Sequence, residues 1–239
     1  MNGEVKTKKK TIGILGGMGP EASVALFRKI IEKTPASRDQ DHLRVIIDNN
    51  PAIPDRTQAI LHGGESPLPM LKASAQVLEQ AGADLIAMPC NSAHYYLAGI
   101  REAVKIPILD MIEETVKAIQ ERVVGFMATD GTVQVGLYHQ ACEKRGIEVL
   151  QPEAEDQKAI MGVIYSIKAG QEKLFLKQKT HRVVRGLQER GAEAVIAGCT
   201  ELSLILKQDE IAIPLYDALD ILAQAAVNKA LSGFRSRRK

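Results

Sequence analysis

Short apolar runs of strand length alternate along this chain with longer amphipathic stretches that repeat apolar residues at helical spacing. This alternation is typical of parallel sheets joined by crossover helices, so the pattern predicts an α/β fold. The predicted strands are Thr11–Leu15, Leu43–Asp48, Leu85–Met88, Ile106–Leu109, Val123–Met127, Ile147–Leu150, Ala194–Ala197 and Ile213–Leu215.

Prolines and glycines mark the ends of the predicted helices. Proline is tolerated in a first helical turn because that turn lacks amide partners, so helices are expected to begin near Pro20, Pro67 and Pro69. The clearest helices are Gln157–Ala169 and Glu172–Arg190, and Gly191 follows the second one as a C-terminal cap.

One segment of the chain occurs twice. Gly82-Ala-Asp-Leu-Ile-Ala-Met-Pro-Cys90-Asn91 is echoed by Gly191-Ala-Glu-Ala-Val-Ile-Ala-Gly-Cys199-Thr200. Each copy has an apolar run between its glycine and its cysteine, and a small polar residue follows the thiol. The chain therefore contains an internal repeat, and each copy carries one thiol.

The repeat extends to both sides of the cysteines. Ile12-Gly-Ile-Leu15 matches Val124-Gly-Phe-Met127, and Ile106-Pro-Ile-Leu-Asp110 matches Ile213-Pro-Leu-Tyr-Asp217. These echoes predict two pseudo-symmetric domains, each a mostly parallel sheet flanked by helices.

We expect the two domains to face each other across a cleft at the carboxyl ends of the strands, where such sheets bind ligands. The first domain comprises residues 1–112 plus 215–239 and carries Cys90, and the second comprises residues 113–214 and carries Cys199. The final helix, from Asp217 on, is expected to pack back on the first domain.

Composition narrows the class of protein. The chain has 239 residues, of which 45% are hydrophobic and 25% charged, as is usual for a soluble globular protein. No apolar run approaches the roughly 20 residues of a membrane-spanning helix, and the lysine-rich start is not followed by a signal-peptide core. We therefore expect a cytoplasmic protein with no membrane partner.

Charge and cysteine content exclude two further classes. A net charge of +2 is too small to indicate nucleic-acid binding, and the basic end Arg235–Lys239 is expected to be a solvated tail. Three cysteines do not resemble a disulfide framework, so reduced thiols are expected. Metal binding is not indicated, because Cys90 and His94 have no further cysteine nearby to complete a zinc site.

Both repeated cysteines follow a buried strand and precede a helix. Backbone amides and the positive end of that helix should then point into the cleft, where they would bind a carboxylate and lower the pKa of the thiol. The alternative for one such cysteine is inert packing, but matched positions in both copies of the repeat argue against it. Cys142 lies within a predicted helix and has no echo, so we interpret it as packing.

The loop Gly16-Gly-Met-Gly-Pro-Glu-Ala22 fits the dinucleotide fingerprint, which leaves a nicotinamide enzyme as an alternative. The acid expected about 20 residues later is missing, because the next strand ends at Asp48. That alternative also leaves both thiols unexplained. We prefer the loop as a backbone nest for a carboxylate.

A second loop, Asn49–Thr57, faces the same cleft. In it, Arg56 could clamp a carboxylate and Asp55 could orient Arg56 or receive an ammonium group, although a plain surface ion pair is equally compatible with the sequence. Lys168 stands at the end of a predicted helix, where a cation also favours the helix terminus.

The chain resembles the aspartate racemases, the cofactor-independent branch of the aspartate/glutamate racemase superfamily. The resemblance covers about residues 11 to 232 and rests on Ile-Gly-Ile-Leu-Gly-Gly-Met-Gly-Pro, Asn-Pro-Ala-Ile-Pro-Asp-Arg-Thr, Pro-Cys-Asn-Ser-Ala-His, Ile-Lys-Ala-Gly and Gly-Cys-Thr-Glu-Leu. It implies that Cys90 and Cys199 are the acid/base pair. It also implies a homodimer and a reaction without a cofactor.

The resemblance implies a set of substrate-binding residues around the two thiols, with Asn91 and Thr200 on the α-carboxylate. The full set is Met18, Asn49, Asp55, Arg56, Asn91, Ser92, Lys168, Thr200 and Glu201. Ser92 stands where the motif more often has threonine. Dedicated glutamate racemases look like Asp-Ser-Gly in the first loop and Gly-Cys-Thr-His at the second cysteine, so aspartate is favoured here.

We therefore predict an L/D-aspartate racemase in which one thiolate removes the α-proton and the other thiol supplies a proton to the opposite face. Three alternatives stay open beside the nicotinamide enzyme. They are a broad-specificity racemase, a glutamate-preferring racemase, and an amino-acid-binding protein without turnover.

Overall fold

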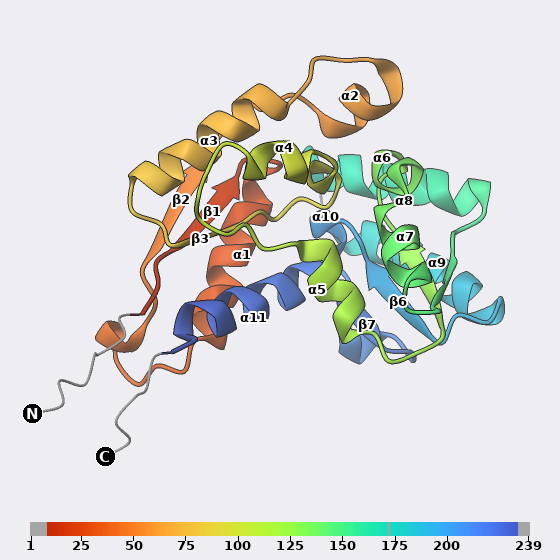
Figure 1. Cartoon of the computed structure of the whole chain (residues 1–239). Helices are drawn as coiled ribbons and strands as arrows, with labels where there is room; N and C mark the ends of the chain where they lie inside the picture. The colour runs from red at the N-terminus through yellow and green to blue at the C-terminus, as the bar shows by residue number, and fades with distance from the viewer. Residues whose placement is uncertain (1–8, 172, 234–239) are drawn as a thin grey trace, which may run out of the picture.

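The computed structural model describes residues 9–171 and 173–233 and contains two separate parallel sheets (Figure 1). The first has the order β2-β1-β3, with β1 at Ile12–Gly16, β2 at Val45–Asn49 and β3 at Leu85–Ala87. The second has the order β5-β4-β6-β7, with β4 at Val123–Met127, β5 at Glu148–Leu150, β6 at Ala194–Ala197 and β7 at Leu215–Asp217. The predicted α/β class with two sheets is confirmed.

The two sheets repeat each other in register as well as in strand order. Gly13 of β1 pairs with Ile86 of β3, and the equivalent Gly125 of β4 pairs with Val195 of β6. Cys90 lies four positions after Ile86, and Cys199 lies four positions after Val195. The sequence repeat is therefore a structural repeat that brings both thiols to equivalent strand ends.

The predicted strand Ile106–Leu109 is the one strand that the first sheet does not form in full. It is reduced to a single parallel bridge between Ile86 and Ile108, at the position that β7 occupies in the second sheet. The backbone turns into a helix directly after this segment, and Asp110 caps that helix.

The first sheet is covered by helices on both faces. Ile12 and Ile14 pack under α1 (Pro20–Lys33) and α11 (Ala218–Leu231). Leu15 and Ile86 point to the other face, under α3 (Leu68–Gln80) and α4 (Leu97–Arg101). Alternate side chains of each buried strand thus serve two apolar layers.

The second sheet follows the same plan. Met127 and Val195 pack under α8 (Ala154–Lys168) and α9 (Lys173–Glu189), while Val124 and Phe126 face α5 (Met111–Ala118) and α7 (Leu137–Glu143). The structure thus contains the helices predicted at Gln157–Ala169 and Glu172–Arg190, of which Glu172 lies outside the described residues.

The two halves exchange helices. Helix α5 continues the chain from the first sheet but packs on the second, with Ile112 and Val116 in its core. Helix α11 follows β7 of the second sheet and crosses back to lie beside α1, where the blue helix meets the red one in Figure 1. The expected return of the final helix to the first half is confirmed.

The predicted domain boundary at residue 215 needs one correction. Strand β7 pairs with β6 through Leu215, Tyr216 and Asp217, so these residues belong to the second sheet. The segment that returns to the first half begins at Ala218, the first residue of α11.

Short helices occupy the remaining connections. They are η1 (Asp39–Asp41), α2 (Arg56–His62), η2 (Ser92–Tyr96), α6 (Asp130–Val135), α10 (Thr200–Ser203) and η3 (Gln208–Glu210). Within the described ranges, no helix combines the length and apolar character that crossing a bilayer requires.

Candidate active site

A small cavity, partly open to solvent, lies between the two halves at the carboxyl ends of their strands. We call it the inner cavity. Of the residues predicted for the site, those that line it are Met18, Asp55, Arg56, Cys90, Asn91, Ser92, Lys168, Cys199, Thr200 and Glu201. Residues far apart in sequence, contributed by both halves, therefore meet in one place.

Asn49 is the predicted site residue that does not line the inner cavity. It ends β2, is exposed, and lies beside Gly16, its partner in the parallel ladder. The loop that follows β2 brings Asp55 and Arg56 to the cavity instead.

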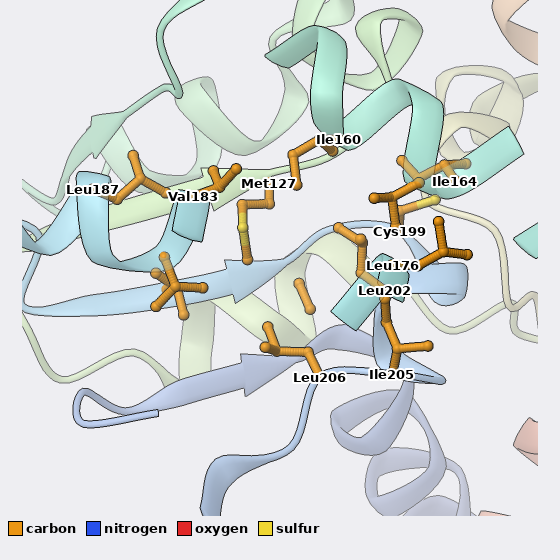
Figure 2. Close-up of a cluster of buried hydrophobic side chains, with 14 of the residues drawn as sticks. Met127, Ile160, Ile164, Leu176, Val183, Leu187, Cys199, Leu202, Ile205 and Leu206 are labelled. Carbon is orange, nitrogen blue, oxygen red and sulfur yellow. The ribbon is translucent and has the colours of Figure 1, made fainter. Parts of the chain in front are cut away.

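The Cys199 thiol lies at the edge of the hydrophobic core of the second half. Figure 2 shows it beside Ile164 and Leu202, and the residue is only 7% exposed. Its Sγ donates a hydrogen bond to Glu201 Oε2 over 2.9 Å, and the Thr200 hydroxyl donates to the same carboxylate oxygen over 3.4 Å. Cys199 is therefore paired with a carboxylate two residues further along.

This environment corrects the sequence-based expectation for the second thiol. Burial raises the pKa of Cys199 well above its usual range, and the negative charge of Glu201 raises it further, while Lys168 opposes the shift. The lowering expected from the helix end is outweighed, because the short α10 cannot offset burial and an adjacent carboxylate. Cys199 thus rests as a thiol.

The Cys90 thiol has a different partner. Its Sγ lies 3.5 Å from the Ser92 hydroxyl, so the departure from threonine at that position keeps a hydroxyl beside the thiol. The backbone carbonyl of Cys90 accepts a hydrogen bond from Nδ1 of the buried His94, 2.8 Å away. This fixes the course of the loop that carries the thiol.

Arg56 and Asp55 are not paired with each other as a surface ion pair would be. Asp55 accepts a hydrogen bond from the backbone of Gln58 and caps α2. Arg56 is buried, and its guanidinium donates to backbone carbonyls of the loops that carry Ile53 and Met18. Its buried Nε has no protein partner, and Arg56 lines a cavity that suits a carboxylate.

Lys168 reaches the inner cavity from the end of α8. Burial alone would lower the pKa of its ammonium, but the negative charge of Glu201, with further contributions from Cys199 and Cys90 in their ionised forms, outweighs that effect, so the pKa is raised. Lys168 therefore remains a cation and, together with Arg56, places two positive groups at the cavity.

A larger outer cavity, open to solvent, adjoins the inner one. Asp55, Arg56, Lys168 and Glu201 line both cavities. Much of the remaining wall of the outer cavity is apolar and comes from Ile53, Ile167 and Leu204, together with Pro20 and Pro51. The charged residues thus stand at the junction between a small polar chamber and a wider, more apolar one.

The sequence analysis missed three threonines that line the inner cavity: Thr57, Thr129 and Thr132. The Thr129 hydroxyl caps α6 by accepting from the backbone N–H of Thr132. The repeat offered a signal for this pair, because the loop after β4 is equivalent to the loop after β1.

The glycine loop after β1 has a structural explanation. Gly17 has a φ of +96°, and a Cβ there would lie 2.3 Å from the backbone of Asn50. The glycine therefore permits close packing of two loops of this chain, and the nicotinamide alternative is not needed to explain it.

Comparisons with known proteins agree on one family. A family model described as Asp/Glu/Hydantoin racemase matches residues 15–226. The broad specificity amino-acid racemase RacX of Bacillus subtilis is 31% identical over 92% of this chain and 98% of its own. Two solved structures are also similar.

The first of these structures is the aspartate racemase of Picrophilus torridus, which is 31% identical, with a TM-score of 0.85 over 95% of this chain and 96% of that one. The second is an aspartate racemase homologue from Pyrococcus horikoshii, which is 28% identical, with a TM-score of 0.76 over 92% and 99% of the two chains. Both likenesses extend over nearly the whole chain.

Proposed function

Because this chain belongs to the Asp/Glu/hydantoin racemase family, we propose that it interconverts L- and D-aspartate, with Cys90 and Cys199 as the two acid/base groups and without a cofactor. The observation that carries this proposal is the position of the thiols. They come from equivalent strand ends of two repeated halves and line one cavity. A substrate bound between the halves would present opposite faces of its α-carbon to them.

The charges of the cavity support a dicarboxylate substrate. Arg56 and Lys168 supply two cations, of which Arg56 has a buried Nε–H without a partner. We assign the side-chain carboxylate of aspartate to these two residues and its α-carboxylate to the cysteine loops at Asn91 and Thr200. Asp55 uses one carboxylate oxygen to cap α2 and also lines the cavity, and we assign it to the ammonium group.

The resting state of Cys199 sets the order of proton transfers. As a thiol, Cys199 is ready to donate its proton to a carbanionic α-carbon. In that direction of the reaction Cys90 is the base that removes the α-proton from the other face. This turnover leaves Cys199 deprotonated and Cys90 protonated, which is the state from which the reverse reaction proceeds, with Cys199 as the base and Cys90 as the acid. The Glu201 carboxylate accepts a hydrogen bond from the resting Cys199 thiol over 2.9 Å and so holds it as the proton donor. Each cycle then moves one proton from one thiol to the other.

Proton transfer alone does not account for the rate of such a reaction, because the α-hydrogen of an amino acid is a very weak acid. Positioned acid/base groups typically contribute about 10²–10⁴-fold. The remaining stabilisation must come from fixed charges and donors near the developing enolate, and Lys168, Arg56 and the loop amides are the groups available here.

A broad-specificity racemase is the second candidate, and the outer cavity favours it. Its apolar wall at Ile53, Ile167 and Leu204 could receive side chains longer than that of aspartate. The similarity to a relative with broad specificity supports the same alternative. A glutamate preference and a binding protein without turnover are the other outcomes that the experiment must separate.

We expect the folded, reduced protein in D₂O to remove the α-proton signal of L-aspartate faster than those of L-glutamate and L-leucine, with the D-enantiomer appearing. Cys90→Ala and Cys199→Ala should each lower racemisation by at least about 10³-fold, within the range assigned to one acid/base group. Each variant should still exchange the α-proton of one enantiomer, and the two variants should act on opposite enantiomers. Proton NMR with chiral analysis measures both effects.

Cys142→Ala is the matched control, because Cys142 is a buried thiol of α7 whose pKa burial raises to about 11 and which does not line the cavity. Racemisation by Cys90→Ala or Cys199→Ala at the parent rate would refute the two-thiol mechanism. Comparable rates for all three amino acids would select broad specificity. Binding without α-proton exchange would select the binding protein.

A further inference from the structure

Tyr138 is a fully buried tyrosine of α7 whose hydroxyl leaves the core of the second half and reaches the first half. Its ring packs against Phe126, with ring centroids 4.6 Å apart. Its hydroxyl donates a hydrogen bond to Asn91 Oδ1 over 2.7 Å. Burial raises the pKa of Tyr138, so this hydroxyl keeps its proton at neutral pH.

This bond determines which end of the Asn91 amide faces the substrate. An asparagine amide has one acceptor oxygen and one donor nitrogen. The oxygen is occupied by Tyr138, whereas Asn91 Nδ2 is buried and has no protein partner. Asn91 lines the inner cavity, so its unpartnered donor is available to a ligand there.

An unpaired buried donor is costly, since it has given up water without gaining a partner. A carboxylate can supply that partner, because an ionised carboxylate only accepts hydrogen bonds. If the amide turned over, its oxygen would face the carboxylate instead and repel it. The orientation of this one amide therefore decides whether the loop attracts or rejects a carboxylate.

We propose that Tyr138 is a positioning residue for substrate binding: it holds the Asn91 amide so that Nδ2 points at the α-carboxylate. The inference rests on the proposed function for the identity of the substrate. Because Tyr138 comes from the second half and Asn91 from the first, the binding loop of Cys90 is set correctly only when the two halves are together.

The test is Tyr138→Phe, which removes the hydroxyl and keeps the ring in the core. We expect the KM for L-aspartate to rise about tenfold, as for the loss of one well-placed hydrogen bond, while kcat changes by less than about threefold. Tyr216→Phe is the matched control. Its hydroxyl donates to Glu121 Oε2 over 2.6 Å and does not line the cavity, so that variant should keep the parent KM.

A double variant separates positioning from packing. If Tyr138 acts through Asn91, adding Tyr138→Phe to Asn91→Ala should change the KM by less than about twofold. Asn91→Asp provides a second test that keeps the acceptor for Tyr138. It places an acceptor at the cavity and should weaken L-aspartate binding by more than 100-fold.

A parent-like KM for Tyr138→Phe, full additivity with Asn91→Ala, or parent-like binding by Asn91→Asp would each overturn the inference. Succinate titrated into the same folded variants and followed by calorimetry distinguishes this failure from failure of the proposed function. If the parent protein racemises no amino acid but Tyr138→Phe binds succinate about tenfold more weakly, only the proposed function fails. Unchanged or undetectable succinate binding by the parent and the variant overturns the inference as well.

Discussion

At the scale of single residues, the surroundings of a buried cysteine distinguish a site residue from a packing residue. Cys142 and Cys199 are both buried thiols, but Cys199 donates to Glu201 Oε2 at the cavity, whereas Cys142 is packed within α7. The sequence repeat was enough to separate them. It did not reveal the bond between Tyr138 and Asn91, because a contact between two halves has no local signature in either segment.

His94 is the second residue that holds the Cys90 loop. Its Nε2 accepts from the backbone N–H of Met111 over 3.1 Å, so the hydrogen of the neutral ring is on Nδ1, which donates to the Cys90 carbonyl. Burial lowers the pKa of His94 and is opposed mainly by the charge of Asp110, while Arg101 lowers the pKa further. The folded protein therefore favours the neutral imidazole.

Stability should depend on pH through this ring. Because the folded-state pKa lies below the unfolded value of about 6.5, the unfolded chain binds more protons once the pH falls below that value. The contribution is therefore present above about pH 6.5 and is lost on acidification, by at most about 1.4 kcal/mol per pH unit for one proton. Urea unfolding at pH 7.5 and 5.5 should show a smaller loss for His94→Gln than for the parent.

The other histidine whose pKa burial lowers, His139, is present in both proteins and cancels in this comparison. An equal loss of unfolding free energy in the parent and in His94→Gln would show that His94 does not titrate in this way.

At the scale of secondary-structure elements, the echoed segments that end in Asp110 and Asp217 turn out to be helix starts. Asp110 accepts from the first backbone amides of α5, and Asp217 does the same for α11. The sequence predicted strands at Ile106–Leu109 and Ile213–Leu215, before these acids. The structure has β7 two residues later, at Leu215–Asp217, and only a bridge at Ile108. The repeat predicted where these segments lie better than whether they form strands, because a segment of three or four residues is too short to show a clear hydrophobic periodicity.

Asp217 should contribute more to stability than a helix cap alone. Its Oδ1 accepts from two α11 amides and from the Ser203 hydroxyl, at 2.6 Å, and its Oδ2 lies 3.3 Å from Lys29 Nζ. We expect Asp217→Ala to lower the free energy of unfolding by about 2 kcal/mol, from the cap and the hydroxyl bond together. Asp217→Asn keeps an acceptor and should cost about half as much.

Chemical denaturation of the two Asp217 variants beside Asp110→Ala measures these differences. Asp110 supplies the equivalent cap without the ion pair to Lys29, so its removal should cost about 1 kcal/mol. Equal losses for Asp217→Ala and Asp217→Asn would mean that the charge, and not the cap, carries the effect.

At the scale of the whole molecule, the two halves meet closely at the rim of the inner cavity. A Cβ on Gly131 of α6 would lie 3.0 Å from the Thr57 hydroxyl and 3.1 Å from the Thr57 backbone of α2. The sequence predicted the two halves and the cleft between them. It also predicted that the final helix returns to the first half. It did not predict how closely the two halves approach at Gly131 and Thr57, because a contact between residues far apart in sequence has no local pattern.

The added methyl group of Gly131→Ala should therefore displace α6 from α2 at the edge of the inner cavity. We expect kcat/KM for L-aspartate to fall about tenfold, because small displacements of reacting groups are costly in rate, while the protein stays folded. Gly162→Ala is the matched control within α8, since its Cβ would meet nothing within 4 Å. That variant should keep the parent kcat/KM and gain about 0.5–1 kcal/mol of stability. A parent-like kcat/KM for Gly131→Ala would show that α2 and α6 accommodate the added methyl group without displacing the reacting groups.

The exchange of α5 and α11 between the halves also suggests how the two-halved chain could have arisen from a shorter one. The same arrangement results when two copies of one shorter chain form a domain-swapped dimer, in which the last helix of each copy packs on the other, and are then joined end to end. In such an ancestor Cys90 and Cys199 would have been a single residue related to itself by a twofold axis. That axis would pass through the bound molecule. A symmetric pair of identical subunits would then have placed one thiol on each side of the carbon atom, and its symmetry would not have favoured either configuration.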